Sequence, residues 1–426
     1  MKPVARFEHA LELMLTQRGD PSAEIERALA DDPQSVFGHC LRLALIVRAD
    51  DISARSVLVA SIAAIEAACP DRDDPARRHA SAARAWFEGH PDLAVERYSA
   101  IVRDDPRDIL ALVAAHALDF HLGQRRSMRN RLARALPHWK PAMPGYEGVL
   151  AMYAFALEES GQYRRAEKMA RRALALNSKH PYAIHVVAHV MEMQGRAREG
   201  LEFLAATETV WAHGSGFSVH LAWHRALFHL DANDPMGALK IYDEKIANAQ
   251  SWDKSQLADA SALLWRLELQ NIDVGKRWRA LADRWETQKL AGARPFYIVH
   301  AMMAFAAARR TAAVARLMEI WASAHASDEL PAFPEEALAP PFCEALLAFV
   351  RSDYSASVEW LTRVRHIAHR CGGSLAQCDL IHLTFTEAAL RAHRARLARS
   401  LVAERTAKKP ASLLNRLLMQ RLPAAA

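Results

Sequence analysis

The sequence predicts an all-α protein of antiparallel helix pairs that stack as a helical-repeat superhelix, an α-solenoid. Glycine (16) and proline (19) are sparse among 426 residues, and the alanine- and leucine-rich composition favours helix. No stretch alternates apolar and polar residues as a β-strand would. The third observation is a repeating unit of 34 to 38 residues. Stacked repeats bury their apolar faces against one another, so a long chain can fold without one large core.

Turn residues at regular spacing mark the repeat. Gly89, Gly123, Gly161, Gly195 and Asn233 follow one another at steps of 34, 38, 34 and 38 residues. Glycine and asparagine suit the left-handed residue that ends a helix, and 34 residues is the tetratricopeptide period. The steps of 38 imply four-residue insertions. Where two helices cross closely, a small residue is expected five positions after the turn, at Ala94, Ala166, Gly200 and Ala238.

The repeats predict one superhelix over residues 1–426, with the clearest units in 75–250. Prolines make the segment 330–342 the strongest break in the second half, so we expect a loop there and a weak domain boundary. Residues 391–426 are expected to form basic C-terminal capping helices.

The net charge of +6 is concentrated at the C-terminus, where residues 391–426 carry nine Lys or Arg and one acid. The rest of the chain is near neutral, so nucleic acid is not an expected partner. We expect the basic segment to be solvated or to contact an anionic surface or partner. No apolar run suits a membrane span, and five scattered cysteines indicate no disulfide framework. A cytoplasmic protein without membrane contact is the expectation.

Histidine spacing indicates where a ligand binds. In a tetratricopeptide unit the first helix lines the concave groove, and His185, His189 and Glu192 lie at i, i+4 and i+7 on one such helix. His220 and His224 repeat the i, i+4 spacing on the next first helix. The residues expected to line one groove are Phe155, Glu158, His185, His189, Glu192, His220, Trp223 and His224.

The two H-x-x-x-H pairs suggest a divalent metal as one occupant of the groove. Two imidazoles at i, i+4 can chelate an ion, but the glutamate of a metalloprotease helix is missing between them. Together His185, His189, His220 and His224 could form a four-histidine or a two-metal site. Direct contact with a peptide, protein or small-molecule ligand and a purely structural role remain alternative interpretations.

No catalytic motif of a nucleotide-binding, dinucleotide-binding or serine-hydrolase type is present, so no catalytic residue is identified. A binding or scaffold protein is the leading interpretation. An enzyme is the alternative, either a metal-assisted hydrolase or a histidine acid/base catalyst in the same groove.

Several stretches carry a family resemblance, the most specific being the run H-x-V-A-H-V-x-E-M (185–193) followed by H-x-x-W-H (220–224). Over about 105–310 the chain resembles the tetratricopeptide repeat protein 38 family. The resemblance implies a helical-repeat protein whose motif falls on His185, His189, Glu192, His220, Trp223 and His224. One departure is that Ile298 and Val299 precede His300, where the family often has an acidic residue. The other matching stretches are 116–139, 150–174, 238–243, 261–267 and 299–305.

Overall fold

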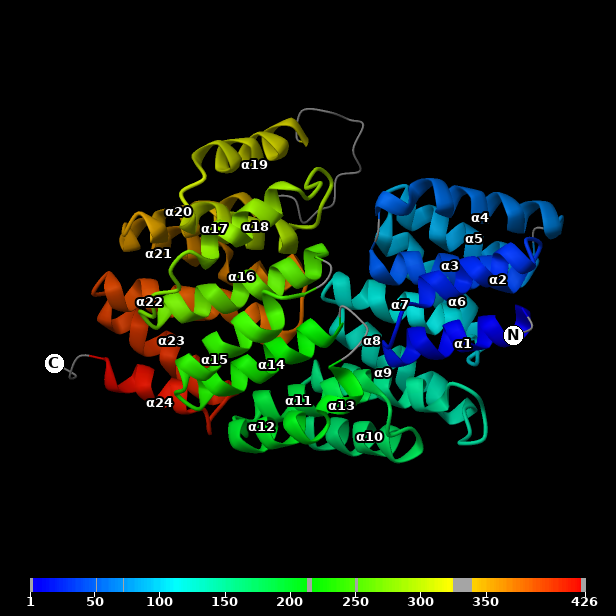
Figure 1. The fold of residues 1–426 in the computed structure, drawn as a ribbon, viewed down its shortest axis with the longest axis horizontal. Helices are drawn as coiled ribbons and strands as arrows, with labels where there is room; N and C mark the ends of the chain where they lie inside the picture. The colour runs from blue at the N-terminus through cyan, green and yellow to red at the C-terminus, as the bar shows by residue number, and fades with distance from the viewer. Residues whose placement is uncertain are drawn as a thin grey trace. The chain divides into compact units, whose positions relative to one another are not determined.

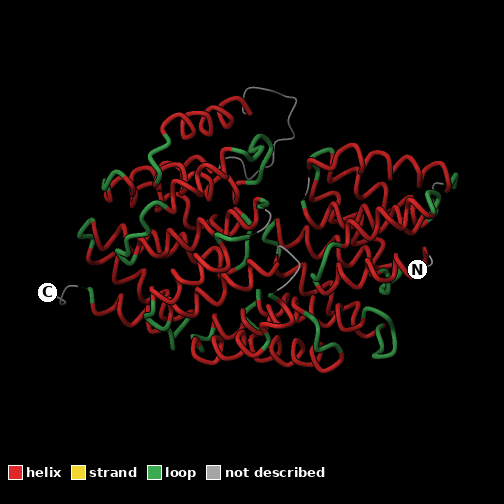
Figure 2. Tube along the Cα trace, viewed as in Figure 1, coloured by secondary structure: helices red, strands yellow, loops and turns green. Residues whose placement is uncertain are grey.

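The protein is all-α. A computed structural model describes residues 3–50, 52–71, 73–212, 217–249, 252–324 and 339–422, and helix accounts for 78% of these residues. Within these ranges there is no strand, and Figure 2 shows helices joined by loops. No described helix combines the length and apolar character that crossing a bilayer requires. The predicted fold class, helix pairs in a helical-repeat arrangement, is confirmed.

The first compact unit spans residues 1–187 and consists of antiparallel helix pairs (Figure 1). Its helices are α1 (Pro3–Thr16), α2 (Pro21–Asp31), α3 (Val36–Ala49), α4 (Arg55–Ala68), α5 (Pro75–Phe87), α6 (Pro91–Asp104), α7 (Ile109–His121), α8 (Arg125–Ala135), α9 (Tyr146–Glu158), α10 (Tyr163–Leu176) and the first part of α11 (Pro181–Met193).

The second compact unit begins at Ala188, inside α11, and runs to the C-terminus. A single superhelix over 1–426 stays a prediction. The remaining helices are α12 (Ala197–Ala206), α13 (Glu208–Trp211), α14 (Phe217–Asp231), α15 (Pro235–Ile241), α16 (Lys254–Leu269), α17 (Arg277–Glu286), α18 (Pro295–Ala307), α19 (Thr311–Ala324), α20 (Ala339–Val350), α21 (Tyr354–Val364), α22 (Leu375–Arg391), α23 (Ala395–Lys408) and α24 (Leu413–Gln420).

The turn residues are where the spacing predicts them. Gly89, Gly123, Gly161, Gly195 and Asn233 all have positive φ, from 60° to 83°, and each separates two helices of a pair. Positive φ is inexpensive for glycine and tolerated by asparagine, which explains their use here. The predicted small residues are buried at helix crossings. Those with 0% exposure are Ala94, Ala166 and Ala238.

Pairs in the second half use turn residues that the sequence pattern does not reveal. Asn271, Arg309, Ser352 and His393 adopt φ between 55° and 61° at the ends of α16, α18, α20 and α22. A buried small residue follows by five positions at Ser357 and at Ala398, both with 0% exposure. The repeat therefore continues without glycine turns.

The expected loop at 330–342 is corrected at its end, because Ala339–Phe342 form the first turn of α20. Pro340 and Pro341 are tolerated there, since the first turn of a helix needs no donated N–H. Residues 330–338 lie outside the described residues. The basic segment after Arg391 contains α23 and α24, and their role as capping helices stays a prediction.

Enlarging a residue at a helix crossing should destabilise the protein. A Cβ atom on Gly200 would lie 2.3 Å from the Phe228 ring, and Ala166 has no exposed surface. We expect Gly200→Leu and Ala166→Leu each to lower the free energy of unfolding by about 1–3 kcal/mol. Denaturant titration measures this. Lys168→Leu, on the exposed face of the Ala166 helix, is the control, and equal stability of all three variants would contradict the assigned crossings.

Candidate functional site

Three helices of the second unit bring titratable side chains together. His189 and Glu192 come from α11, His220 and His224 from α14, and Asp259 from α16. His189 and His224 have 0% exposure, and Glu192 and Asp259 have 6% and 3%. The side chain of His220 is 17% exposed, so it is the member of the group nearest to solvent. We call these five residues the histidine cluster.

Two carboxylates flank two imidazoles in one continuous chain of contacts. Nδ1 of His220 lies 2.8 Å from Oδ2 of Asp259, and Nδ1 of His224 lies 2.9 Å from Oε2 of Glu192. The two Nε2 atoms face each other at 3.2 Å. The order of groups is therefore carboxylate, imidazole, imidazole, carboxylate.

The carboxylates determine which ring nitrogens carry protons. An ionised carboxylate only accepts hydrogen bonds, so both Nδ1 atoms donate and both Nε2 atoms keep their lone pairs when the rings are neutral. Two lone pairs at 3.2 Å repel each other. The arrangement is favourable only with a positive charge beside both Nε2 atoms, supplied either by one extra proton or by a metal ion.

His189 adds a third imidazole. Its ring centroid lies 4.4 Å from that of His224. One ring nitrogen from each of His189, His220 and His224 can be chosen such that all lie within 4.8 Å of one another. Three nitrogen donors at this separation fit around a single small ion.

Burial and neighbouring cations keep His224 neutral. Burial lowers the pKa of His224 well below its usual range, and the adjacent His189 and His220 lower it further. Trp223, fully buried, stacks on His220 at 5.4 Å and 13°, and the Arg266 guanidinium lies 5.4 Å from the Trp223 ring centroid. A neutral His224 is the form that binds a metal.

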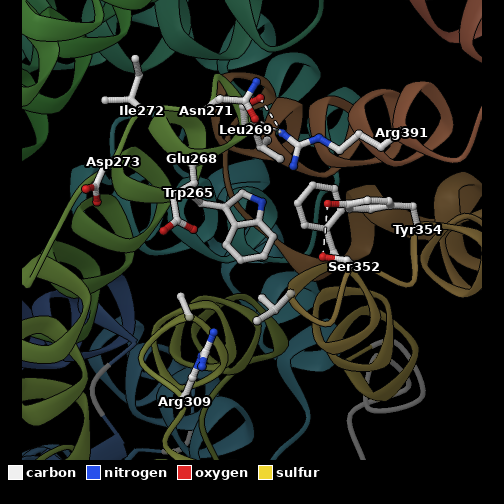
Figure 3. A pocket seen from close by; sticks show the side chains of 13 residues that line it. Trp265, Glu268, Leu269, Asn271, Ile272, Asp273, Arg309, Ser352, Tyr354 and Arg391 are labelled. Carbon is white, nitrogen blue, oxygen red and sulfur yellow. Dashed lines mark hydrogen bonds between the residues drawn. The ribbon is translucent and has the colours of Figure 1, made fainter.

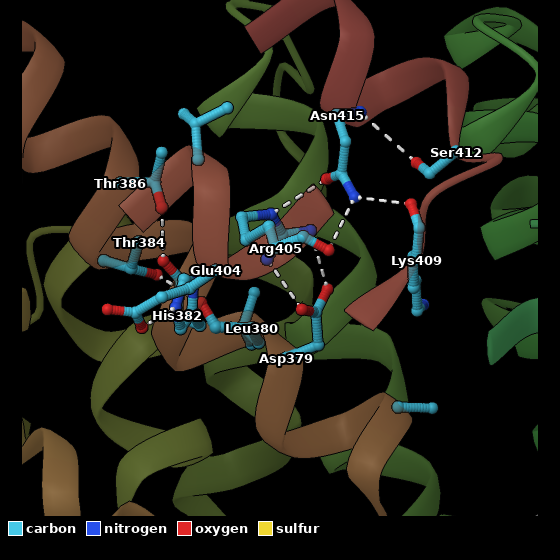
Figure 4. A network of polar contacts seen from close by, with 12 residues as sticks. Asp379, Leu380, His382, Thr384, Thr386, Glu404, Arg405, Lys409, Ser412 and Asn415 are labelled. Carbon is cyan, nitrogen blue, oxygen red and sulfur yellow. Dashed lines mark hydrogen bonds and ion pairs between the residues drawn. The ribbon is translucent and has the colours of Figure 1, made fainter. Parts of the chain in front are cut away.

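The C-terminal segment supplies a cation to the cluster. Nζ of Lys409 donates to Oε1 of Glu192 at 3.2 Å, while Oε2 of the same carboxylate accepts from His224. Lys409 is held by Asn415, whose Nδ2 donates to its carbonyl at 3.1 Å (Figure 4). Burial alone would lower the pKa of Lys409, but Glu192 and Asp379 raise it, so the side chain is an ammonium.

Other predicted site residues belong to the first unit. His185 lies one helical turn before His189 on α11 and stacks on Phe155 and Tyr182, with centroids 5.8 and 5.9 Å away. Glu158, the last residue of α9, has 0% exposure. The role of these residues in a groove stays a prediction.

Of the eight expected residues, five meet in the second unit: His189, Glu192, His220, Trp223 and His224. Four of them are buried and His220 is partly exposed, because packed helices and Lys409 surround them. Residue spacing does not identify Asp259 and Lys409 as members of the site. Asp259 was detectable as a lone acid within the apolar helix LADASALLW, whereas nothing distinguished Lys409 within its basic segment.

A cavity of about 380 Å³ lies elsewhere in the second unit, at the turns that follow α16, α18 and α20 (Figure 3). Trp265, Phe349 and Tyr354 form aromatic walls, and the left-handed turn residues stand at its edge. Arg391 donates to the Leu269 carbonyl at 3.1 Å, which caps α16. None of the residues that line this cavity belongs to the histidine cluster.

Fold and cluster together define an all-α helical-repeat protein with a buried histidine–carboxylate site. No family model matches the chain. Among solved structures, the chain is similar to one described as "Structure of Naa15/Naa10 bound to HypK-THB", with 10% identity and a TM-score of 0.28. The match covers 97% of this chain and 64% of that chain, so this protein spans less than two thirds of its length. A score this low carries no argument about function.

Buried neutral histidines should make the protein labile to acid. Burial lowers the pKa of His116 from 6.5 to about 3, and those of His180 and His300 to about 4. As the pH falls below 6.5, these histidines take up protons in the unfolded chain before they do so in the folded protein. The free energy of unfolding therefore decreases as the pH falls from 6.5 toward 4. Each contributes about 1.4 kcal/mol per pH unit in this window. Melting temperatures at pH 7 and pH 5 measure the loss.

Substitution of His300 isolates the contribution of one buried imidazole to the acid lability. Nδ1 of His300 donates to the Phe296 carbonyl at 2.7 Å, the one hydrogen bond described for this ring. His300→Gln should show a smaller decrease in melting temperature between pH 7 and pH 5 than the parent, whereas the exposed control His138→Gln should match the parent. An unchanged decrease in His300→Gln would contradict the assignment.

Proposed function

We propose that this protein is a helical-repeat protein of the tetratricopeptide repeat protein 38 type that binds a divalent transition-metal ion at His189, His220 and His224. One observation carries the proposal: the Nε2 atoms of His220 and His224 face each other at 3.2 Å while both Nδ1 atoms are held by carboxylates. A cation beside the two lone pairs removes their repulsion.

The distance between the two nitrogens suits a metal ion. Zinc–imidazole bonds are about 2.0–2.1 Å, so two nitrogens on one tetrahedral zinc ion lie about 3.3 Å apart. The observed separation is 3.2 Å. A metal ion at this position would also use the third imidazole, His189, as a ligand.

The outer carboxylates also suit a metal site. Histidine ligands of metals usually donate their other ring N–H to a carboxylate, which orients the ring and makes it a stronger ligand. Asp259 does this for His220 and Glu192 does it for His224. Imidazole ligands favour zinc, cobalt, nickel or copper over magnesium and calcium, which prefer oxygen.

His185 extends the proposal. It precedes His189 by one helical turn but belongs to the first unit, so its part in a four-histidine site stays a sequence-based prediction. Without it, three imidazoles leave one position for water or substrate, as in catalytic zinc sites. The indole N–H of Trp223 has no acceptor among the described residues. A metal-assisted hydrolase stays the alternative to a metal-binding scaffold.

Metal loading tests the proposal. Purified protein, stripped with a chelator and titrated with Co²⁺ or Zn²⁺, should bind about one ion, with the visible absorption of Co²⁺ reporting nitrogen coordination. His224→Ala and the partly exposed His220→Gln should lose binding and keep their helical circular dichroism. His229→Gln, on the same helix but paired with Asp234, should bind as the parent does. Absence of binding in the parent, or unaltered binding in both cluster variants, would overturn the proposal.

The outer carboxylate provides a second test. Asp259→Asn keeps the shape of the side chain but removes the charge that holds His220 as a donor through Nδ1. Affinity for Zn²⁺, measured by competition with a chelator of known affinity, should fall by about 10–100-fold. Asp243→Asn, an acid whose ion pair with Arg277 lies on the surface, should leave the affinity unchanged.

A further inference from the structure

Lys409 and the histidine cluster share one carboxylate. Glu192 accepts from His224 through Oε2 and from Lys409 through Oε1, at 2.9 and 3.2 Å. The exposed fractions of the Lys409 and Glu192 side chains are 12% and 6%, so water screens this contact only weakly. The ammonium is a fixed positive charge on the side of Glu192 opposite to His224.

The surrounding segment holds Lys409 in place. Arg405 makes a two-point ion pair with Asp379, at 2.6 and 3.1 Å, and its Nε donates to Asn415 at 3.1 Å (Figure 4). Asn415 in turn donates to the Lys409 carbonyl. Lys409 is therefore positioned by a network within the second unit and is not a freely moving surface lysine.

The residues that follow Lys409 contact the end of α14 and pack closely against the α11–α12 turn. Ser412 donates to Asp231, and a Cβ atom on Gly195 would lie 2.8 Å from the backbone of Ala411 and of Ser412. Only glycine allows this approach at a turn with φ of 69°. Gly195, the turn residue after α11, therefore also leaves room for the segment that carries Lys409.

The shared carboxylate links the ammonium to metal binding. In the metal-free protein Lys409 balances the charge of Glu192, which would otherwise be buried with only a neutral imidazole as partner. A bound divalent cation supplies positive charge on the His224 side of the same carboxylate. The two cations repel each other and compensate the same negative charge. Each therefore reduces the stabilisation that the other gains from the Glu192 carboxylate.

We propose that Lys409 is a positioning residue that stabilises the metal-free site and lowers its affinity for the metal ion. This inference rests on the proposed function. Neutralising Lys409, by substitution or by acetylation, removes the competing charge. The C-terminal segment thereby regulates how tightly the cluster holds its ion.

The test uses the full-length chain and Zn²⁺ with a competing chelator. Lys409→Met should bind Zn²⁺ roughly tenfold more tightly or better, and its metal-free form should melt at a lower temperature than the parent. Lys409→Arg keeps the charge and should restore both values. Lys408→Met, at the exposed neighbouring position, should behave as the parent.

The opposite directions of the two effects separate regulation from simple structural support. A lysine that only supports the fold would lower both affinity and melting temperature when removed, and that result would overturn the inference. Zn²⁺ binding by the parent with no tightening in Lys409→Met would overturn it as well, while the proposed metal site would stand. If the parent binds no Zn²⁺, both proposals fail.

Discussion

The helix pairs depend on chain reversals that bring two backbones close together within a few residues. In α5–α6, α9–α10, α11–α12 and α14–α15 a left-handed residue ends the first helix, and a small residue five positions later lets the second helix cross it. Gly200 shows how little space a crossing leaves, since even a methyl group there would overlap the Phe228 ring. Non-glycine residues in this conformation cost roughly 1–2 kcal/mol, which Arg309 and Ser352 bear because the packing of their pairs compensates.

The same stacking places the histidine cluster. Adjacent pairs set first helices beside one another, so an i, i+4 histidine pair on α14 meets residues of α11 and α16. Buried carboxylates are destabilising unless each has a partner of opposite charge or a donor. Glu192 has two such contacts, and Asp259 accepts from both His220 and Gln377. The polar site is tolerated within an apolar unit because each of its carboxylates accepts hydrogen bonds from neighbouring side chains.

Residue patterns alone predict the helix pairs of 75–250, because glycine and asparagine turns recur there with small residues behind them. They do not predict the pairs around Arg309, Ser352 and His393, where the conformation comes from tertiary packing and not from local preference. For the site, helical spacing identifies the histidines and Glu192. Asp259 and Lys409 lie 39 and 217 residues from their partners, distances over which no local pattern operates.

The separation of 217 residues between Glu192 and Lys409 has a consequence for synthesis on the ribosome. At about 5–20 residues per second, Lys409 is made roughly 10–40 s after Glu192. For most of this interval His189, His220 and His224 already exist in the nascent chain, while Lys409, which pairs with Glu192 in the finished protein, does not. The growing chain therefore passes through a stage in which Glu192 has been made but still lacks its ammonium partner.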